Sequence, residues 1–479
     1  MQKLIGRKRE TNLLMDSLRS GRPEFVAVYG RRRIGKTYLV KQLLGDEFCF
    51  YMTGVYNYTK QQILSYFQAQ LAKYSGQKRR KPHNWFEAFA QLRDYLSGLS
   101  ERERLVIFID ELPWLDTPRS DFLPSFELFW NGWASEHSNL KLIVCGSATT
   151  WMTNKLIGDR GGLHNRVTRK IHLGPFCLAE TEELLRSKGI IWTRHQIVEC
   201  YMAMGGTPYY LEKLDKAYSL PQNLDRLFFS ENAELAEEYG FLFRSLFKDA
   251  ITYQRLVELL AKRAVGMRRE EITQALGIQS GGKLSEALDN LINCDFIRRY
   301  NAFGATSTGA LYQLTDLYTL FYLRYVKGNR GSDEQFWSHR IDSPSHRAWS
   351  GYAFEQVCLH HVWQIKRKLG INGIQSNVCS WIQRAVPEHG KRGAQIDLII
   401  DRRDQVVNLC EIKYALHPYE ITPGYMEEVI ERREAFRQST STRKALHITF
   451  ITTCGLKANA QSGMVQSEVS LDDLFSEPD

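Results

Sequence analysis

A glycine-rich loop with one lysine and one threonine is the clearest candidate for chemistry in this sequence. Residues 30–37 read Gly-Arg-Arg-Arg-Ile-Gly-Lys-Thr, which is the G-x-x-x-x-G-K-[ST] spacing of phosphate-binding loops. The two glycines let the backbone curl so that amide N–H groups point at phosphate oxygens. Lys36 is expected to reach the β- and γ-phosphates, and Thr37 to offer its hydroxyl to Mg²⁺. We predict that the following residues bind the nucleotide: Gly30, Arg31, Arg32, Arg33, Ile34, Gly35, Lys36, Thr37 and Tyr38.

A pair of carboxylates follows a continuous apolar run in the same half of the chain. Residues 105–109 have the composition of a buried parallel strand, and Asp110 and Glu111 come directly after them. Ligands of open α/β sheets bind at the carboxyl ends of the strands. We therefore expect Asp110 to hold Mg²⁺ through water and Glu111 to orient or polarise the attacking water. Lys36, Asp110 and Glu111 are thus predicted catalytic residues, and Thr37 and Asp110 predicted metal ligands.

Further polar residues follow a third apolar run, residues 140–146. Ser147, Thr149 or Thr150 could sense the γ-phosphate or the attacking water, and the alternative is a helix N-cap. We include Ser147 among the nucleotide-binding residues. Arg160 and Arg166 lie in a glycine-rich loop and could stabilise the transferring phosphoryl group, in cis or from a neighbouring subunit. Solvated loop arginines are the more common alternative.

A second group of carboxylates lies near the C-terminus. Asp397, Glu411 and Lys413 have the D…E-x-K spacing of a nuclease centre, within the strand-like runs 395–400 and 406–413. Alternation along a strand puts Glu411 and Lys413 on one face, and a hairpin would bring Asp397 alongside. Together with Glu355 these carboxylates could ligate Mg²⁺ or Mn²⁺, while Lys413 positions the nucleophile. The alternative is a solvated hairpin face, but burying unpaired carboxylates in apolar strands is costly.

The elements expected to position these groups alternate between strand and helix over residues 1–175. The pattern predicts strands at 25–29, 48–52, 105–110 and 140–146, and helices around Leu13, Leu14 and Leu18, after Thr37, and over 63–74. Residues 176–250 become helical, and the Gly-Gly-Thr-Pro sequence at 205–208 predicts a turn followed by a proline-initiated helix. We interpret this stretch as a helical lid over the nucleotide.

Residues 251–315 have the pattern of a winged helix. Three helices are predicted at 251–261, 268–277 and 280–294, followed by two wing strands at 296–300 and 311–314. Ser280, Gly282 and Lys283 would then begin the recognition helix. Winged helices bind DNA, but they also bind proteins, and both interpretations remain open.

The remaining part of the chain is expected to combine helices with a sheet. Tyr318, Phe321, Tyr322 and Tyr325 form an aromatic stripe that we expect in the core rather than on a stacking surface. Further predictions are a helix opening at 353–355, strands at 380–383 and 447–453, and a helix over 426–437.

Composition limits the class of protein. The chain has 479 residues, enough for about three domains. Its net charge of +9 is compatible with nucleic acid but also with many ordinary enzymes. It has no apolar run of membrane-spanning length, and its first seven residues lack an apolar signal core and a small-residue cleavage site. Its nine cysteines are scattered without a C-x-x-C pair. We expect buried free thiols and a cytoplasmic protein.

With these motifs in place, the chain resembles a prokaryotic ATPase family common in archaea and some bacteria. That family is a branch of the STAND/AAA+ P-loop proteins, and joins an ATPase core to a winged helix and a C-terminal domain related to PD-(D/E)XK nucleases. The matching segments are 5–7, 30–37, 110–114, 146–147, 205–211, 316–318, 351–355, 411–413 and 471–475, with Asp397. The resemblance implies ATP hydrolysis by Lys36, Thr37, Asp110 and Glu111, and a nuclease-like centre at Glu355, Asp397, Glu411 and Lys413.

The predicted architecture is therefore α/β with several domains. We expect a P-loop ATPase core over 1–175, a helical lid over 176–250, a winged-helix domain over 251–330 and a restriction-endonuclease-like domain over 331–479. The predicted function is an ATP-hydrolysing ATPase coupled to DNA binding and metal-dependent cleavage of DNA, with ATP and Mg²⁺ as cofactors and Mn²⁺ possible at the second centre. The alternative is a nucleotide-dependent switch or scaffold that binds DNA or protein without cutting it. A homo-oligomer is allowed, and no membrane partner is expected.

Overall fold

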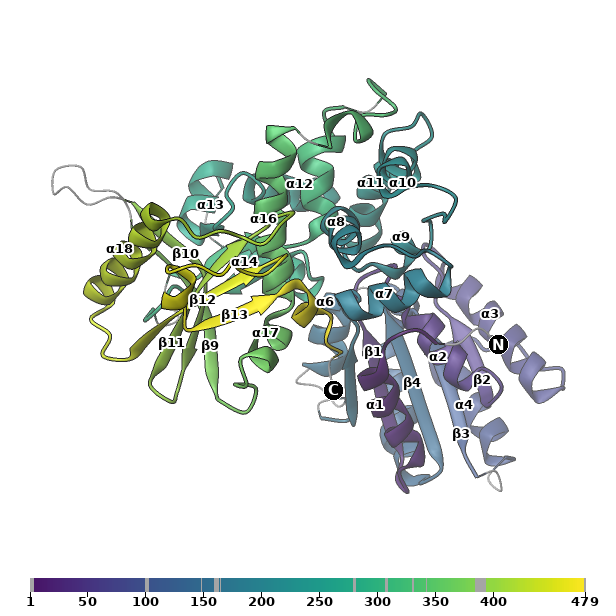
Figure 1. The fold of residues 1–479 in the computed structure, drawn as a ribbon. Coiled ribbons are helices and arrows are strands. Elements are labelled where there is room, and N and C mark those ends of the chain that lie inside the picture. The colour runs from purple at the N-terminus through teal and green to yellow at the C-terminus, as the bar shows by residue number, and fades with distance from the viewer. Residues whose placement is uncertain are drawn as a thin grey trace. The chain divides into compact units, whose positions relative to one another are not determined.

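The computed structural model contains two compact units, which are described separately (Figure 1). The first unit extends to Gly174 and includes Ser245–Lys248; the second comprises Pro175–Arg244 and the chain from Asp249 onward. The structure describes residues 4–99, 103–147, 149–158, 163, 165–278, 281–305, 309–329, 331–341, 343–383 and 393–477.

A five-stranded parallel sheet forms the centre of the first unit. Its strand order is β2-β3-β4-β1-β5, so β4 lies between β1 and β3. The strands are β1 Glu24–Tyr29, β2 Phe48–Thr53, β3 Leu105–Asp110, β4 Leu140–Gly146 and β5 Arg169–His172. Every residue of β3 and β4 is buried, because helices cover both faces of the sheet. The four predicted strands of this unit are thereby confirmed, and β5 is an additional strand.

Two apolar cores lie on opposite faces of this sheet. Val26 and Val28 of β1 pack with α1 and α2 on one face, whereas Phe25 and Ala27 pack with α3, α4 and α5 on the other. The helices are α1 Lys8–Arg19, α2 Lys36–Leu44, α3 Lys60–Ser75, α4 Trp85–Ser97, α5 Phe122–Gly132 and the short α6 Thr149–Trp151. The predicted helices α1, α2 and α3 are confirmed, and α4 and α5 are additional.

Helices and an aromatic core begin the second unit. The helices are α7 Leu178–Ser187, α8 Arg194–Met204, α9 Pro208–Leu211, α10 Leu220–Phe228, α11 Glu234–Leu246 and α15 Leu317–Phe321. Tyr318, Phe321 and Tyr325 are buried, and the Tyr318 hydroxyl donates a hydrogen bond to the carbonyl of Leu235 at 2.7 Å. The aromatic stripe is therefore part of the core, as predicted.

Three helices and a small antiparallel sheet follow within the same unit. They are α12 Ala250–Leu260, β6 Met267–Arg268, α13 Arg269–Leu276, α14 Gly282–Asn293, β7 Ile297–Tyr300 and β8 Leu311–Leu314. The strand order is β6-β8-β7. Each predicted helix and strand of this segment is present, and β6 is additional. Ser280, the predicted start of the third helix, lies outside the described residues.

A mixed five-stranded sheet ends the second unit, in the order β13-β12-β11-β10-β9 (Figure 1). Strands β9, β10 and β11 pair antiparallel, and β11, β12 and β13 pair parallel. The elements are α16 Pro344–His360, α17 Val362–Lys368, β9 Ser376–Gln383, β10 Ala394–Arg402, β11 Val406–Lys413, α18 Pro423–Thr440, β12 Ala445–Thr452 and β13 Ser467–Ser470. The prediction that a helix opens at Ala353 was wrong. Helix α16 begins at Pro344, where the Ser343 hydroxyl caps it by accepting the His346 amide.

The remaining regular segments are single turns. The 3-10 turns are Leu112–Leu115, Ala134–Glu136, Ser338–Arg340, Ser462–Met464 and Leu471–Phe475, and the π turns are Met152–Ile157 and Tyr322–Val326. Across the described residues, no helix is long and apolar enough to cross a bilayer. All nine cysteines are free and seven are buried, as predicted. The boundaries of the four domains proposed from the sequence remain predictions.

Candidate functional site

The phosphate-binding loop connects β1 to α2 in the first unit. Gly30 has a φ of 153° and approaches β5 so closely that a Cβ atom there would lie 2.1 Å from the Leu173 carbonyl oxygen. Gly35 has a φ of 93° and precedes the first turn of α2, where no side chain caps the helix. Both positions require glycine, for steric room at Gly30 and for a left-handed backbone at Gly35. The first amides of α2 are therefore available to an anion.

Lys36 lies inside this loop. Its side chain is 5% exposed, and its Nζ donates to the carbonyls of Gly30 and Arg31 and to the Ser147 hydroxyl, each at 2.9 Å. The ammonium group is thus held on the loop's own oxygen atoms. Phosphate oxygens are stronger acceptors for a buried cation than neutral carbonyls, because charge-assisted hydrogen bonds are stronger.

Thr37 and Asp110 meet at the carboxyl end of β3. The Thr37 hydroxyl lies 2.8 Å and 3.0 Å from the two carboxylate oxygens of Asp110. Burial, followed by the neighbouring charge of Glu111, raises the pKa of Asp110 to about 6. A hydroxyl and one carboxylate fit Mg²⁺, which takes few protein ligands and completes its shell with water and phosphate oxygens. These two residues would hold that ion.

Ser147 holds the Glu111 carboxylate through two hydrogen bonds, next to Thr37 and Asp110. The Ser147 hydroxyl donates to Glu111 Oε1 at 2.5 Å, and the Ser147 amide donates to Oε2 at 3.0 Å. Glu111 has a left-handed backbone with φ 46°, a conformation that costs roughly 1–3 kcal/mol and is common at functional sites. Ser147 therefore touches both Lys36 and Glu111. Thr149 instead bonds the Ser147 carbonyl at 3.3 Å, and its side chain is buried.

The other predicted residues of the loop have different environments. Arg31 is buried and Arg32 is exposed. Arg33 is half-buried with a left-handed backbone. The Ile34 side chain packs in the apolar core, so only its backbone can face a ligand. Tyr38 is 47% exposed on α2.

Three arginines outside the loop are relevant to the arginine roles predicted at this site. Arg166 is exposed, and Arg160 lies outside the described residues. Sequence reasoning gave no role to Arg7, which is buried and donates from its guanidinium to the carbonyls of Ile34 at 3.2 Å and Gly174 at 2.7 Å. Arg7 therefore fixes the phosphate-binding loop to the segment after β5. Its sequence signals were its position directly before an amphipathic helix and its place in the matching segment 5–7, and neither indicated a role.

The second predicted centre lies in the mixed sheet. Leu398 of β10 pairs with Cys410 of β11, so continuing this register by one residue sets Asp397 opposite Glu411. Glu411 Oε2 accepts from the Tyr425 hydroxyl at 2.8 Å and lies 3.3 Å from Arg432. The side-chain amide of Gln395 donates to Asp397.

The ionisable groups of this centre lie close enough to shift one another's pKa. Burial, followed by the charge of Asp397, raises the pKa of Glu355 to about 8. Burial also raises the pKa of Asp397 and of Glu411 and lowers the pKa of Lys413. The four predicted residues therefore share one partly desolvated environment. We call Glu355, Asp397, Glu411 and Lys413 the carboxylate cluster.

One cation and one hydrogen-bond donor from α18 complete this arrangement. Arg432 and Tyr425 come from α18, and the Lys413 ammonium lies 4.5 Å from the centre of the Tyr425 ring. Within the described chain, no three His, Cys, Asp or Glu side chains are placed to hold a metal ion. The proposed ligand set Glu355, Asp397 and Glu411 remains a prediction. Gln395 shares a strand face with Asp397 by simple alternation, whereas nothing in the sequence spacing identified Arg432 or Tyr425.

Comparison with known proteins classifies the first part of the chain. Residues 4–214 match a family described as an ATPase domain predominantly from Archaea. The match includes the parallel sheet, the phosphate-binding loop, Asp110 and Glu111. This part of the chain therefore has the α/β fold and the phosphate-binding loop of a P-loop ATPase domain, and its sequence is similar to that family.

Similarity to individual proteins extends further along the chain. The uncharacterized protein MJECL04 of Methanocaldococcus jannaschii is 25% identical over 417 residues, which cover 86% of this chain and 87% of that protein. The Walker-type ATPase paby2304 of Pyrococcus abyssi is similar in structure, with a TM-score of 0.48 and 19% identity over 67% of this chain and 96% of that one. The ORC2 protein of Aeropyrum pernix gives a TM-score of 0.39 and 16% identity over 68% of this chain and 96% of that one.

Proposed function

We propose that this protein binds and hydrolyses ATP with Mg²⁺ at the phosphate-binding loop. The observation that carries the proposal is the chain of contacts that joins Lys36, Ser147 and Glu111 beside the Thr37–Asp110 pair. A cation, a metal-ligating pair and a carboxylate thus converge at the end of β3. Phosphoryl transfer requires this set of groups, because it depends on positioning and charge compensation.

Each residue of the site has a distinct role in hydrolysis. The loop amides and Lys36 bind and orient the triphosphate. Thr37 and Asp110 would hold Mg²⁺, which would supply positive charge to the phosphates. Glu111 orients the attacking water and accepts its hydrogen bond. Ser147 holds the Glu111 carboxylate in the orientation that contacts the attacking water. Because its hydroxyl also accepts from Lys36, its hydrogen bonding would change when Lys36 binds the γ-phosphate.

Phosphate release from ATP tests this proposal. Glu111→Gln should lower the turnover by about 10²–10³, the effect of removing one group that stabilises the transition state, while ATP still binds. Lys36→Ala should weaken ATP binding at this loop by about 100-fold or more and abolish turnover. Glu136→Gln is the matched control, because Glu136 is an exposed glutamate of the same unit. Equal turnover in all four proteins would overturn the assignment.

A metal-dependent nuclease centre at the carboxylate cluster is a second proposal. It is supported by four ionisable side chains with shifted pKa values in one place. Plasmid, linear, single-stranded and branched DNA should be cut with Mg²⁺ or Mn²⁺, and Asp397→Ala should abolish cutting. Asp404→Asn is the control, because Asp404 is exposed on the same hairpin. If the parent chain and Asp397→Ala leave every substrate equally intact with and without ATP, the second proposal fails.

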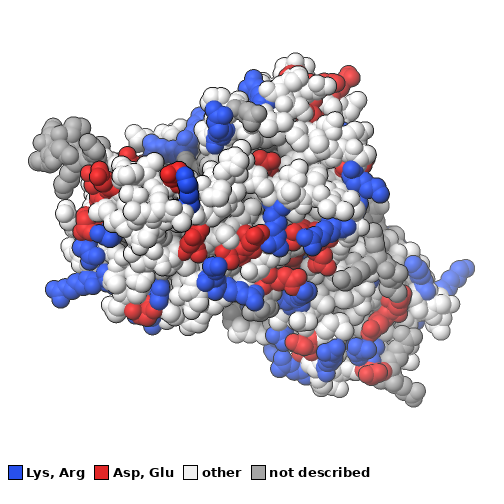
Figure 2. Space-filling view, in the orientation of Figure 1, with Lys and Arg blue, Asp and Glu red and all other residues white. Residues whose placement is uncertain are grey.

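A nucleotide-dependent switch that binds without cutting is the alternative. The pairing of Glu411 with Arg432 favours it, because a paired carboxylate needs no metal. The segment from α12 to β8 has the element order of a winged helix. The exposed charges of α14 are Lys283, Glu286 and Asp289, a set that favours a protein partner over a phosphate backbone. Figure 2 shows basic and acidic side chains intermixed on the face in view.

The ATPase core and the second unit together indicate how nucleotide hydrolysis would be used. We propose that an ATP-driven change in the STAND/AAA+-like core alters how the second unit holds DNA or a protein partner. Nine free cysteines fit a reducing compartment such as the cytoplasm.

A further inference from the structure

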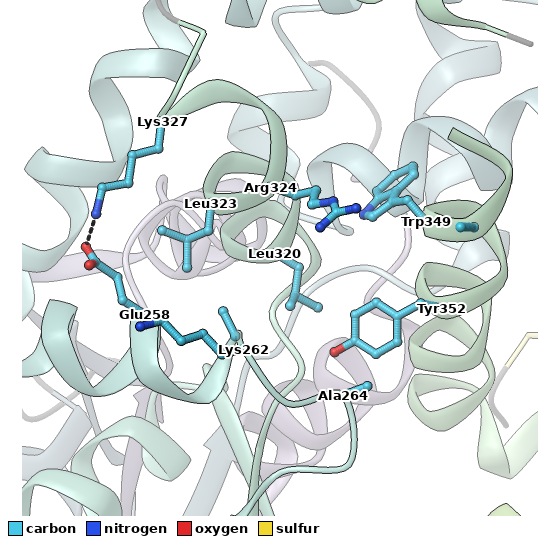
Figure 3. A pocket seen from close by; sticks show the side chains of 11 residues that line it. Glu258, Lys262, Ala264, Leu320, Leu323, Arg324, Lys327, Trp349 and Tyr352 are labelled. Carbon is cyan, nitrogen blue, oxygen red and sulfur yellow. Dashed lines mark ion pairs between the residues drawn. The ribbon is translucent and has the colours of Figure 1, made fainter. Parts of the chain in front are cut away.

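A pocket in the second unit lies outside both clusters described above (Figure 3). Its volume is about 540 Å³, within the range of sites that hold small organic ligands. The end of α12, the turn after α15 and the first half of α16 form its walls. None of its lining residues belongs to the phosphate-binding loop or to the carboxylate cluster.

Positive charge predominates along the rim of this pocket. Lys262, Arg324 and Lys327 line it together with one carboxylate, that of Glu258. Glu258 pairs with Lys327 at 2.7 Å, at one end of the pocket (Figure 3). This pairing leaves Lys262 and Arg324, both exposed, to attract an anion. The guanidinium group offers the planar, two-pronged geometry that phosphate oxygens prefer.

The opposite end is aromatic. Trp349 and Tyr352 of α16 line it, and the Tyr352 hydroxyl points toward the middle of the pocket (Figure 3). The Trp349 side chain is 5% exposed, and its buried Nε1–H has no acceptor among the described residues. Leu320 and Leu323 supply apolar wall between the two ends.

We propose that this pocket binds a nucleotide unit, a base carrying a phosphate. The base would lie against the Tyr352 ring, where a ring nitrogen or carbonyl could accept a hydrogen bond from the Tyr352 hydroxyl, and the phosphate would bind Arg324 and Lys262. Inorganic phosphate alone would leave the apolar walls uncovered, and a fatty acid would place methylene groups against the Tyr352 hydroxyl. This base with its phosphate would come either from a free mononucleotide or from the end of a DNA strand.

Equilibrium dialysis on the full-length Lys36→Ala protein tests the proposal, because that background disables the phosphate-binding loop. The probes are radiolabelled AMP and a short thymidine oligonucleotide with a 5′-phosphate. Lys262→Glu and Arg324→Glu should each weaken binding by about tenfold or more, the scale of one lost charge-assisted contact. Arg255→Glu should leave binding unchanged, because it reverses the charge of an exposed residue seven positions before Lys262 that does not line the pocket. Thermal unfolding confirms that each variant is folded.

The outcomes separate the two sources of the ligand. Binding of AMP identifies a free-nucleotide site, and binding of the oligonucleotide alone identifies a strand-end site. If neither probe binds, or if both charge reversals leave binding unchanged, the proposal is overturned. These results are independent of ATP hydrolysis and of DNA cleavage, because no residue of either centre is altered beyond Lys36.

Discussion

At the scale of single residues, the hydroxyl of Ser147 joins two opposite charges. It accepts from the Lys36 ammonium and donates to the Glu111 carboxylate. A γ-phosphate that draws Lys36 away would change one of these bonds and leave the other in place. Ser147 is therefore suited to couple the occupancy of the loop to the orientation of Glu111.

Ser147→Ala tests this role. Removing one hydrogen bond to a charged group costs about 1.5 kcal/mol, so turnover should fall about tenfold while ATP affinity changes little. Steady-state ATP hydrolysis and ATP binding are measured in parallel. Ser138→Ala, an exposed serine of the same unit, is the control. Unchanged turnover in Ser147→Ala would show that the hydroxyl has no part in the reaction.

The residues of the nucleotide site differ in how far they could be predicted from the sequence. Lys36 and Thr37 follow from spacing within eight residues, because one loop and one helix N-terminus hold the phosphates. Glu111 follows from its place after an apolar strand. Ser147 was only one of three candidates, because its contacts with Lys36 and Glu111 depend on β4 lying between β1 and β3. Arg7 was missed, because its acceptors are far away in the chain.

At the scale of elements, a close backbone approach explains Gly206 in the turn between α8 and α9. A Cβ on Gly206 would lie 1.9 Å from the Phe176 carbonyl oxygen. The Phe176 amide also donates to the Gly206 carbonyl at 2.7 Å. This pairing holds the start of the second unit's chain against α9.

Gly206→Ala should therefore destabilise the second unit by about 1–3 kcal/mol, the usual cost of overpacking. Gly351→Ala is the matched substitution, because Gly351 lies inside α16 and a Cβ there would meet no atom within 4 Å. That change should stabilise the protein by roughly 0.5–1 kcal/mol through helix propensity. Urea unfolding compares the two. Equal stability of both variants would contradict the packing argument.

His361 links two helices in its neutral form. Its Nε2 accepts the Leu178 amide at 3.0 Å at the start of α7, and its Nδ1–H donates to the Val357 carbonyl at 2.7 Å. Burial lowers the pKa of His361 to about 4. Protonation of Nε2 would replace an acceptor by a donor facing an amide N–H. The contact between α7 and α16 should therefore weaken in acid.

The stability of the second unit should depend on pH through this residue. Between pH 6.5 and 4 the unfolded chain binds a proton at His361 and the folded chain does not, so the free energy of unfolding should fall as pH decreases, by roughly 3 kcal/mol in total. Urea unfolding at several pH values measures this slope. His361→Gln should flatten it, and His417→Gln, an exposed control, should not. The same slope in His361→Gln would assign the effect to other groups.

Sequence patterns identified most elements but not all. Apolar parallel strands such as β3 and β4 were clear, because burial on both faces gives uninterrupted apolar runs. Strand β5 was missed, because Arg169–His172 contains a single buried residue. Helix α16 was placed nine residues late, although Ser343 and Pro344 carry a standard N-terminal signal. The early start gives Glu355 three helical turns of support before it.

At the scale of the whole molecule, the helices after residue 175 and the mixed sheet belong to one compact unit. The Tyr414 hydroxyl, one residue after Lys413, lies 2.7 Å from His195 Nε2 and 3.0 Å from Glu199 Oε1 of α8. Together with the bond from His361 to the start of α7, this contact joins the helices to the element that carries the carboxylate cluster. Sequence order could not indicate this grouping, because the contacting residues are about 200 positions apart.

The central claim is that the loop between β1 and α2 binds a nucleoside triphosphate. Calorimetric titration of the full-length protein with ATP and Mg²⁺ tests it most directly. The loop should bind one ATP, and Lys36→Ala should weaken binding at this site by about 100-fold or more, because the triphosphate loses its buried cation. Lys73→Ala, an exposed lysine on α3, should bind normally. No measurable affinity in the parent protein, or equal affinity in Lys36→Ala, would contradict the account.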